Sequence, residues 1–209
     1  MKKSILIFVC VFICTMNAQG NNVRKSIKLI SDSIGVKASN ETNEEAIYKL
    51  ERLDELYPNQ WLIKYYIAYC KFRRGLLNRQ NAVNYFNQAV TYLDEIDPNL
   101  KKENADLLCL EARILIMTLG FDQSKGAEYT PKIAYLVQES MRIAPNNSRV
   151  AFVNGLYKYY MPSFCGGDKE EGKKEFERAY ALFKKEPKDN LPAWNEKLFV
   201  NMVLSIQNK

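Results

Sequence analysis

The sequence predicts an all-α protein built from repeated helix pairs. No segment shows the sustained alternation of apolar and polar residues that a half-buried strand requires. Apolar side chains instead recur three or four residues apart, as on a helix with one buried face. Prolines that end helices also recur, because Pro58, Pro98, Pro145 and Pro187 are separated by 40, 47 and 42 residues. This spacing predicts that one helix-turn-helix unit recurs along the chain.

The N-terminus has the layout of a secretory signal peptide. Two lysines precede an apolar run from Ile5 to Cys14, and small and polar residues follow. The run is shorter than the roughly 20 residues that span a bilayer, which favours a cleaved signal over the alternative, an uncleaved anchor. Ile13 before Cys14 does not fit the pattern of a lipoprotein. We expect cleavage after Ala18 and a mature protein in the periplasm or outside the cell.

The predicted domain organisation follows from this cleavage site. Residues 1–18 form the signal peptide, residues 19–42 an N-terminal helix and linker, and residues 43–209 a single helical domain. Val23, Ile27, Ile30 and Ile34 give the N-terminal helix one apolar face. Thr42 or Asn43 is expected to cap the helix that follows the linker.

The positions of glycine and proline predict where the remaining helices begin and end. We expect Gly75, Gly120 and Gly166 to end the first helix of each pair, and the connection over residues 120–129 to be the longest irregular piece. Pro192 is expected in the first turn of the last helix, where a proline is tolerated. The predicted helices cover residues 44–57, 59–75, 80–96, 103–119, 130–143, 148–160 and 168–184, and a final helix starts at Pro192.

Two second helices carry the same spacing of small and aromatic residues, Ala82-x3-Phe86-x2-Ala89 and Gly172-x3-Phe176-x2-Ala179. This spacing resembles the second helix of a tetratricopeptide repeat, in which a small residue lets two helices approach and an aromatic ring fills the gap. The resemblance covers about residues 43–187, in units longer than the 34 residues of the repeat itself. It implies an α-solenoid of about four antiparallel helix pairs with terminal helices.

The resemblance also places candidate binding residues, because the first helices of such pairs line a concave side where extended partners lie. Ala68, Ala112 and Gly155 would mark equivalent close-packing positions in these helices. Aromatic and arginine side chains are favoured at binding surfaces. The alternative is that these aromatic residues pack between repeats. The candidate partner-binding residues are Tyr65, Tyr69, Phe72, Arg73, Arg113, Phe152, Leu156, Tyr159 and Tyr160.

The composition argues against an enzyme. The chain contains no histidine, which removes Ser-His and Cys-His catalysis and the commonest zinc sites. Cys165 lies just before Gly166, Gly167 and Asp168, where a helix N-terminus could activate a thiol. We expect instead that the glycines form a turn and that Asp168 caps the next helix, with an anion cradle as the alternative. We predict no catalytic residue, no cofactor and no metal site.

Charge and cysteine content are unremarkable for an exported protein. The signal peptide takes two of the 30 basic residues and none of the 24 acidic ones, and the remaining excess is too small to favour nucleic acid as a partner. Cys70, Cys109 and Cys165 stay in the mature chain. A disulfide between two of them is left open, although thiols on apolar helix faces are favoured.

These features predict an exported scaffold or binding protein that binds a protein or peptide partner on a concave aromatic face. Peripheral association with envelope complexes is compatible with this role. The alternative is a periplasmic component of a solute-uptake system that encloses a small ligand. An open groove would favour the first function, and an enclosed aromatic pocket would favour the second. The identity of the partner and the oligomeric state are left open.

Overall fold

The structure, a computed structural model, describes residues 22–34, 39–187 and 189–207, and within these ranges it contains helices and no strand. The all-α prediction is confirmed. The predicted signal peptide at residues 1–18 lies outside the described residues. No helix in the described ranges is long and apolar enough to cross a membrane.

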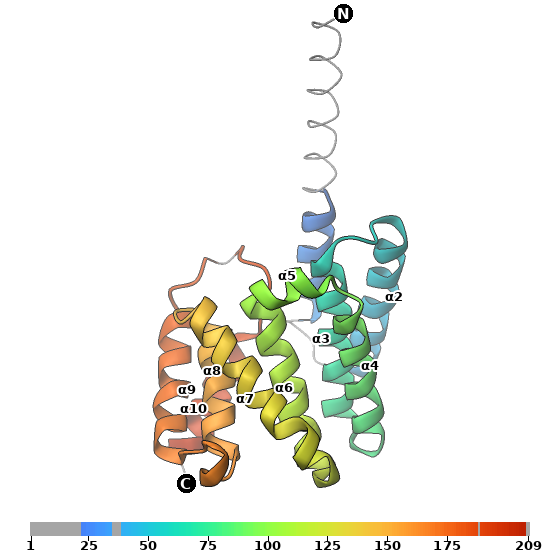
Figure 1. Cartoon of the computed structure of the whole chain (residues 1–209). Helices are drawn as coiled ribbons and strands as arrows, with labels where there is room; N and C mark the ends of the chain where they lie inside the picture. Colours follow the sequence, from blue (N-terminus) through green and yellow to red (C-terminus); the bar gives the residue numbers. More distant parts are fainter. Residues whose placement is uncertain (1–21, 35–38, 188, 208–209) are drawn as a thin grey trace, which may run out of the picture.

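Helix α6 lies at the centre of the array, in contact with its neighbours on several sides (Figure 1). It packs against α7 and also contacts α4 and α8, while α3 packs against α4 and α8 against α9. The N-terminal helix covers residues 22–34. The other helices are α2 (Asn40–Leu56), α3 (Trp61–Leu77), α4 (Ala82–Asp94), α5 (Pro98–Glu103), α6 (Ala105–Phe121), α7 (Gly126–Ile143), α8 (Ser148–Tyr160), α9 (Lys169–Phe183) and α10 (Glu196–Gln207).

The cap of α2 differs from the prediction. Ser39, and neither Thr42 nor Asn43, is the N-cap residue, and its hydroxyl accepts a hydrogen bond of 3.1 Å from the backbone N–H of Thr42. Asn43 is buried, and its side-chain amide donates to the carbonyl of Ser39 at 2.6 Å. The helix therefore begins at Asn40, because a serine one turn earlier satisfies its first free amide groups.

The turn before α9 follows the prediction. The side chain of Asp168 accepts hydrogen bonds from two backbone N–H groups in the first turn of α9. Gly166 has a φ of 88°, a left-handed conformation that glycine adopts without strain. Gly167 serves a different purpose, because a Cβ there would lie 1.8 Å from the carbonyl oxygen of Met161. Gly166 and Gly167 therefore form the turn between α8 and α9, and Asp168 caps α9.

Glycines 75 and 120 do not end their helices, contrary to the prediction. Gly75 lies inside α3, and a Cβ at this position would come within 2.4 Å of the Phe86 ring of α4. Gly155 of α8 is covered in the same way by Phe176 of α9, at 2.7 Å. Each ring fills the space that a glycine leaves on the facing helix, so these glycines set how closely the paired helices approach.

The connection over residues 120–129 is more regular than predicted. Gly120 and Phe121 complete α6, a 3₁₀ turn covers Gln123–Lys125, and α7 begins at Gly126. A second difference is α5, which the sequence analysis missed. Pro98 stands in its first turn, and Asp97 caps it. A proline that ends one helix can therefore begin the next, because its missing N–H is not needed in a first turn.

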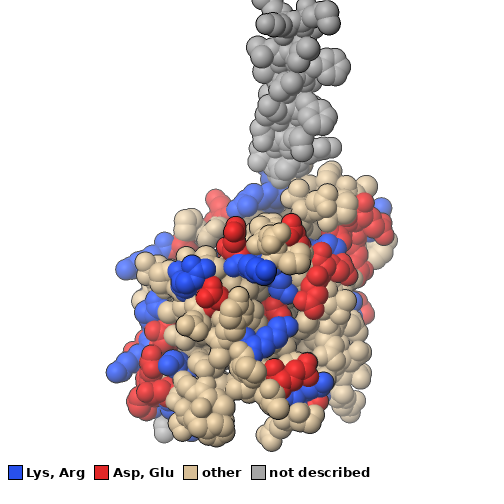
Figure 2. Space-filling view, viewed as in Figure 1, with Lys and Arg blue, Asp and Glu red and all other residues tan. Residues whose placement is uncertain are grey.

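Buried charges connect the elements around α6. Arg149 of α8 is 3% exposed, and it pairs with Asp106 of α6 at 2.7 Å and with Glu186, after α9, at 3.0 Å. Glu111 of α6 is 1% exposed and pairs with Lys101 and Lys132, at 2.8 and 2.7 Å. Each of these buried charges thus has an opposite charge beside it, as burial requires. On the surface, basic and acidic residues are interspersed (Figure 2).

Replacement of Gly75 by alanine should lower the free energy of unfolding by about 1–3 kcal/mol, because the new methyl group overlaps the Phe86 ring. Gly120→Ala is the matched control, since a Cβ there meets nothing within 4 Å. In an exposed helical position, alanine should stabilise by about 1 kcal/mol. Urea unfolding of both variants checks this, and equal effects would contradict the role of Gly75 in close packing.

Stability should fall at alkaline pH. Burial raises the pKa of the Cys70 thiol to about 12 and that of the Tyr66 hydroxyl to about 12. The unfolded groups ionise near pH 8.5 and 10, so the unfolded state loses protons first. Stability that is complete below about pH 8 is therefore lost as the pH rises toward 12. Urea unfolding between pH 8 and 10.5 measures the slope. Cys70→Ala should make it shallower, and an unchanged slope would contradict this origin.

Candidate binding sites

The structure buries most of the predicted binding residues. Tyr65 and Phe72 are fully buried, and Tyr69, Arg113, Phe152 and Leu156 are no more than 5% exposed. Arg73 and Tyr159 are half-buried, and Tyr160 is 57% exposed. The first six side chains are therefore core residues in the structure, as in the alternative in which the aromatic residues pack inside the protein. A role of these residues in binding a partner stays a prediction.

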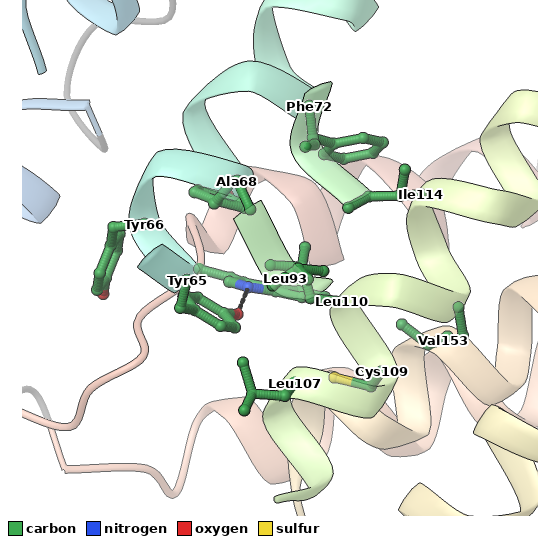
Figure 3. Close-up of a cluster of buried hydrophobic side chains, with 14 of the residues drawn as sticks. Tyr65, Tyr66, Ala68, Phe72, Leu93, Leu107, Cys109, Leu110, Ile114 and Val153 are labelled. Atoms are coloured by element: carbon green, nitrogen blue, oxygen red, sulfur yellow. Dashed lines mark hydrogen bonds between the residues drawn. The ribbon is translucent and has the colours of Figure 1, made fainter. Parts of the chain in front are cut away.

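The structure does bring the predicted residues of α3, α6 and α8 together, as one buried cluster. Figure 3 shows Tyr65 and Phe72 of α3 with the apolar side chains of α6 and Val153 of α8. The Tyr65, Tyr66 and Tyr69 rings meet edge to face, with centroids 5.5 and 6.4 Å apart along this series. The exposed Tyr160 contacts Tyr159 at the end of α8, outside this cluster.

The cluster is closed by the C-terminal segment (residues 189–199), in which a helix was predicted to start at Pro192. Pro192 is not in a first helical turn, because α10 begins only at Glu196. Trp194 is 4% exposed and inserts its indole among the aromatic rings. Its Nε1–H donates to the Tyr65 hydroxyl at 2.8 Å (dashed line in Figure 3), and its ring stacks on Tyr69 at 6.2 Å and 7°. The chain's own C-terminal segment thus covers the face that was predicted to bind a partner.

Arg113 is a buried cation at the base of this cluster. Its guanidinium carbon lies 4.5 Å from the ring centroid of Trp194, 4.9 Å from that of Phe72 and 5.5 Å from that of Phe152. Burial lowers the pKa of Arg113, and only uncharged neighbours, Tyr69 first, oppose this shift. Within the described ranges its Nη1 has no hydrogen-bond partner. The guanidinium of Arg113 therefore lies against aromatic faces, whereas that of Arg149 pairs with carboxylates.

Two cavities flank the C-terminal segment. One, of about 370 Å³, is lined by Phe183, Glu186 and Pro187 together with Ala193 and Trp194. The other, of about 320 Å³, also borders Ala193 and Trp194, and its further lining includes Ser31, Tyr69 and Arg73. Arg73 donates from Nη1 to the carbonyl oxygen of Ile34 at 2.6 Å. Ala193 and Trp194 therefore border both cavities.

A larger and more open cavity of about 760 Å³ lies between the N-terminal helix and α2. We call it the N-terminal groove. Three of its large apolar side chains face solvent, since Leu29 is 73%, Tyr48 60% and Leu56 71% exposed. Its remaining lining residues are Ser26, Ile30, Ser33, Glu45, Lys49, Arg52 and Leu53.

Sequence reasoning missed both Trp194 as part of the cluster and the N-terminal groove. Leu29 was a signal for the groove, because it is a large apolar residue off the apolar face made by Ile27, Ile30 and Ile34. Leu56 lies at the end of α2 and is exposed. No signal in the sequence places Trp194 next to residues about 130 positions earlier.

Elsewhere in the described part of the chain, few groups are placed for metal binding or for reaction as a thiolate. No group of three or more histidine, cysteine or acidic residues there is placed to hold a metal ion. Cys70, Cys109 and Cys165 are free thiols, and the first two are buried. Burial raises the pKa of the Cys109 thiol far above its ordinary value, with Asp106 adding to the shift. Ionisation of this thiol near neutral pH is therefore suppressed.

The fold is similar to that of the HusA haemophore from Porphyromonas gingivalis. The TM-score is 0.72, and the match covers 88% of this chain and 92% of that chain, with 16% sequence identity. No protein-family model matches the chain, and no curated protein matches it. At this level of identity the likeness shows a shared helical fold.

Tyr65→Phe should loosen the C-terminal segment, because the buried indole N–H of Trp194 loses its acceptor. The expected loss in the free energy of unfolding is about 1–3 kcal/mol. Backbone amide hydrogen exchange around Trp194 should accelerate by the factor that corresponds to this loss in free energy. Tyr48→Phe is the control, since Tyr48 is 60% exposed. Unchanged exchange in Tyr65→Phe would contradict the anchoring role.

Proposed function

We propose that this chain is an exported, non-enzymatic binding protein that holds a small, largely apolar ligand with acidic groups in the N-terminal groove. The observation that carries the proposal is the exposure of Leu29, Tyr48 and Leu56 around one cavity. Large apolar side chains that gather on a surface mark binding sites. The volume of about 760 Å³ also lies in the range of small-molecule sites, about 300–1,000 Å³.

The similar structure is named a haemophore, and haem is therefore the ligand of this proposal. Its flat apolar ring suits the leucine-lined groove, and its two carboxylates suit the basic Lys49 and Arg52. Histidine cannot hold the iron, because the chain has none. The phenol of Tyr48 is a donor of a type that holds haem iron in other proteins. Lys49 is already paired with Glu45 at 2.6 Å, so Arg52 is the favoured partner of a ligand carboxylate.

A second candidate function follows from the sequence analysis. In this proposal the helix pairs form a tetratricopeptide-like solenoid, and a protein or peptide partner lies on the side lined by α3, α6 and α8. One observation favours it: residues 189–195 of the chain itself, which form no helix, already lie there with Trp194 buried as an anchor. A partner peptide would have to displace this segment. We favour the groove because it is open without such a change.

Haem titration of the mature protein tests the first function. Leu29→Asp should weaken binding at least tenfold, because it places a carboxylate in the apolar lining and close to the acidic groups of the ligand. The measurement is the absorbance change of haem on binding, at constant ionic strength. Tyr48→Phe should retain apolar contact but change the spectrum of the bound iron.

The control is Leu204→Asp, the same substitution at a leucine that is 51% exposed in α10 and does not line the groove. This variant should bind haem as the unaltered protein does. Equal binding by Leu29→Asp and Leu204→Asp, or no binding by the unaltered protein, would overturn the proposed groove site for haem.

A further inference from the structure

The buried guanidinium of Arg113 lacks the partner that comparable charges in this protein have. Arg149 and Glu111 are also buried, and each pairs with two opposite charges. Arg113 is 5% exposed, and its neighbours in the described ranges are aromatic rings and the Tyr69 hydroxyl, with which it forms a hydrogen bond. Its Nη1 has no hydrogen-bond partner there. Burial of a charge without a counter-ion is costly, and ring faces offset only part of that cost. A carboxylate would satisfy the guanidinium far better.

The group that covers Arg113 is flat and aromatic. The Trp194 ring lies 4.5 Å from the guanidinium carbon of Arg113, parallel to Tyr69 and at a right angle to Phe152. Its one polar atom, Nε1, donates to the Tyr65 hydroxyl. The surrounding side chains therefore form a slot for a planar ring, with a cation at the base and a phenol oxygen at the edge.

The segment that carries Trp194 is held mainly by side-chain anchors. Residues 189–195 form no helix, and the backbone N–H of Ala193 bonds to the Tyr66 hydroxyl, a side-chain group, at 2.8 Å. Cavities of about 370 and 320 Å³ border Ala193 and Trp194. Segments with little regular backbone bonding open at lower free energy than helices. We therefore expect opening of residues 189–195 to cost less free energy than unfolding of α3, α6 or α8.

We propose that the slot now filled by Trp194 is a binding site for a planar aromatic carboxylate, whose ring replaces the indole and whose carboxylate pairs with Arg113. The ring would stack on Tyr69 as Trp194 does, and a bidentate pair with the guanidinium would satisfy Nη1. This site is separate from the N-terminal groove, because none of its residues lines that cavity. Binding displaces the C-terminal segment, so the segment acts as an internal competitor.

Indole-3-carboxylate is the probe, because its ring matches that of Trp194, and the neutral indole-3-carboxamide is its matched control. Calorimetric titration of the mature protein should give at least tenfold tighter binding of the carboxylate. In Arg113→Met this preference should disappear, and in Arg113→Lys part of it should return. Equal binding of carboxylate and amide by the unaltered protein, or an unchanged preference in Arg113→Met, would overturn the proposal.

Displacement is measured separately by fluorine NMR of protein labelled with 5-fluorotryptophan. The chain has two tryptophans, so the Trp61 resonance serves as an internal reference. Saturation with indole-3-carboxylate should shift the Trp194 resonance toward that of exposed tryptophan and leave Trp61 nearly unchanged. Bound ligand with an unmoved Trp194 resonance would overturn the slot as the site.

Two further variants keep the test decisive. Trp194→Ala should bind indole-3-carboxylate at least tenfold more tightly than the unaltered protein, because no indole competes. If this variant does not fold, the comparison of Arg113→Met with the unaltered protein still decides. Leu29→Asp, in the N-terminal groove, should leave indole-3-carboxylate binding unchanged, so failure of the haem proposal and failure of this one can be told apart.

Discussion

The burial of α6 on several sides constrains the rest of the structure. This helix contacts α4, α7 and α8, so each charged side chain that it carries must find compensation inside the protein. Asp106 does so through Arg149, and Glu111 through Lys101 and Lys132. Arg113, two residues after Glu111, faces aromatic rings instead. The ion pairs hold the surrounding elements in place, and around Arg113 ring contacts take over this role.

The aromatic cluster has a double role that follows from this arrangement. Tyr65, Tyr69 and Phe152 are core residues, because Trp194 and Phe199 of the C-terminal segment cover them. The same side chains would be exposed if that segment moved away. A surface of rings around a cation is costly to expose to water, so the chain covers it with an aromatic group of its own. The N-terminal groove, in contrast, leaves large apolar side chains in solvent.

Local signals in the sequence were sufficient for the helices and for several of their boundaries. Helix α8 has the predicted limits, and Asp168 caps α9 as expected. The glycines were harder to interpret, because Gly75 could end a helix or admit a neighbouring ring, and only the position of Phe86 decides between the two. Ser39 shows a similar limit, since any of several polar residues could cap α2. The distinction depends on packing around Asn43, which is a tertiary property.

The sequence by itself determined the all-α class and the concentration of aromatic residues on α3 and α8. These features depend on periodicity and on contacts close along the chain. Only the tertiary structure decided that the aromatic cluster is covered, because the contact between Trp194 and Tyr65 joins residues 129 positions apart. It also decided that Leu29 and Leu56 border one groove. Long-range contacts of this kind leave no periodic trace in the sequence, so their partners are set by the packing of the whole chain.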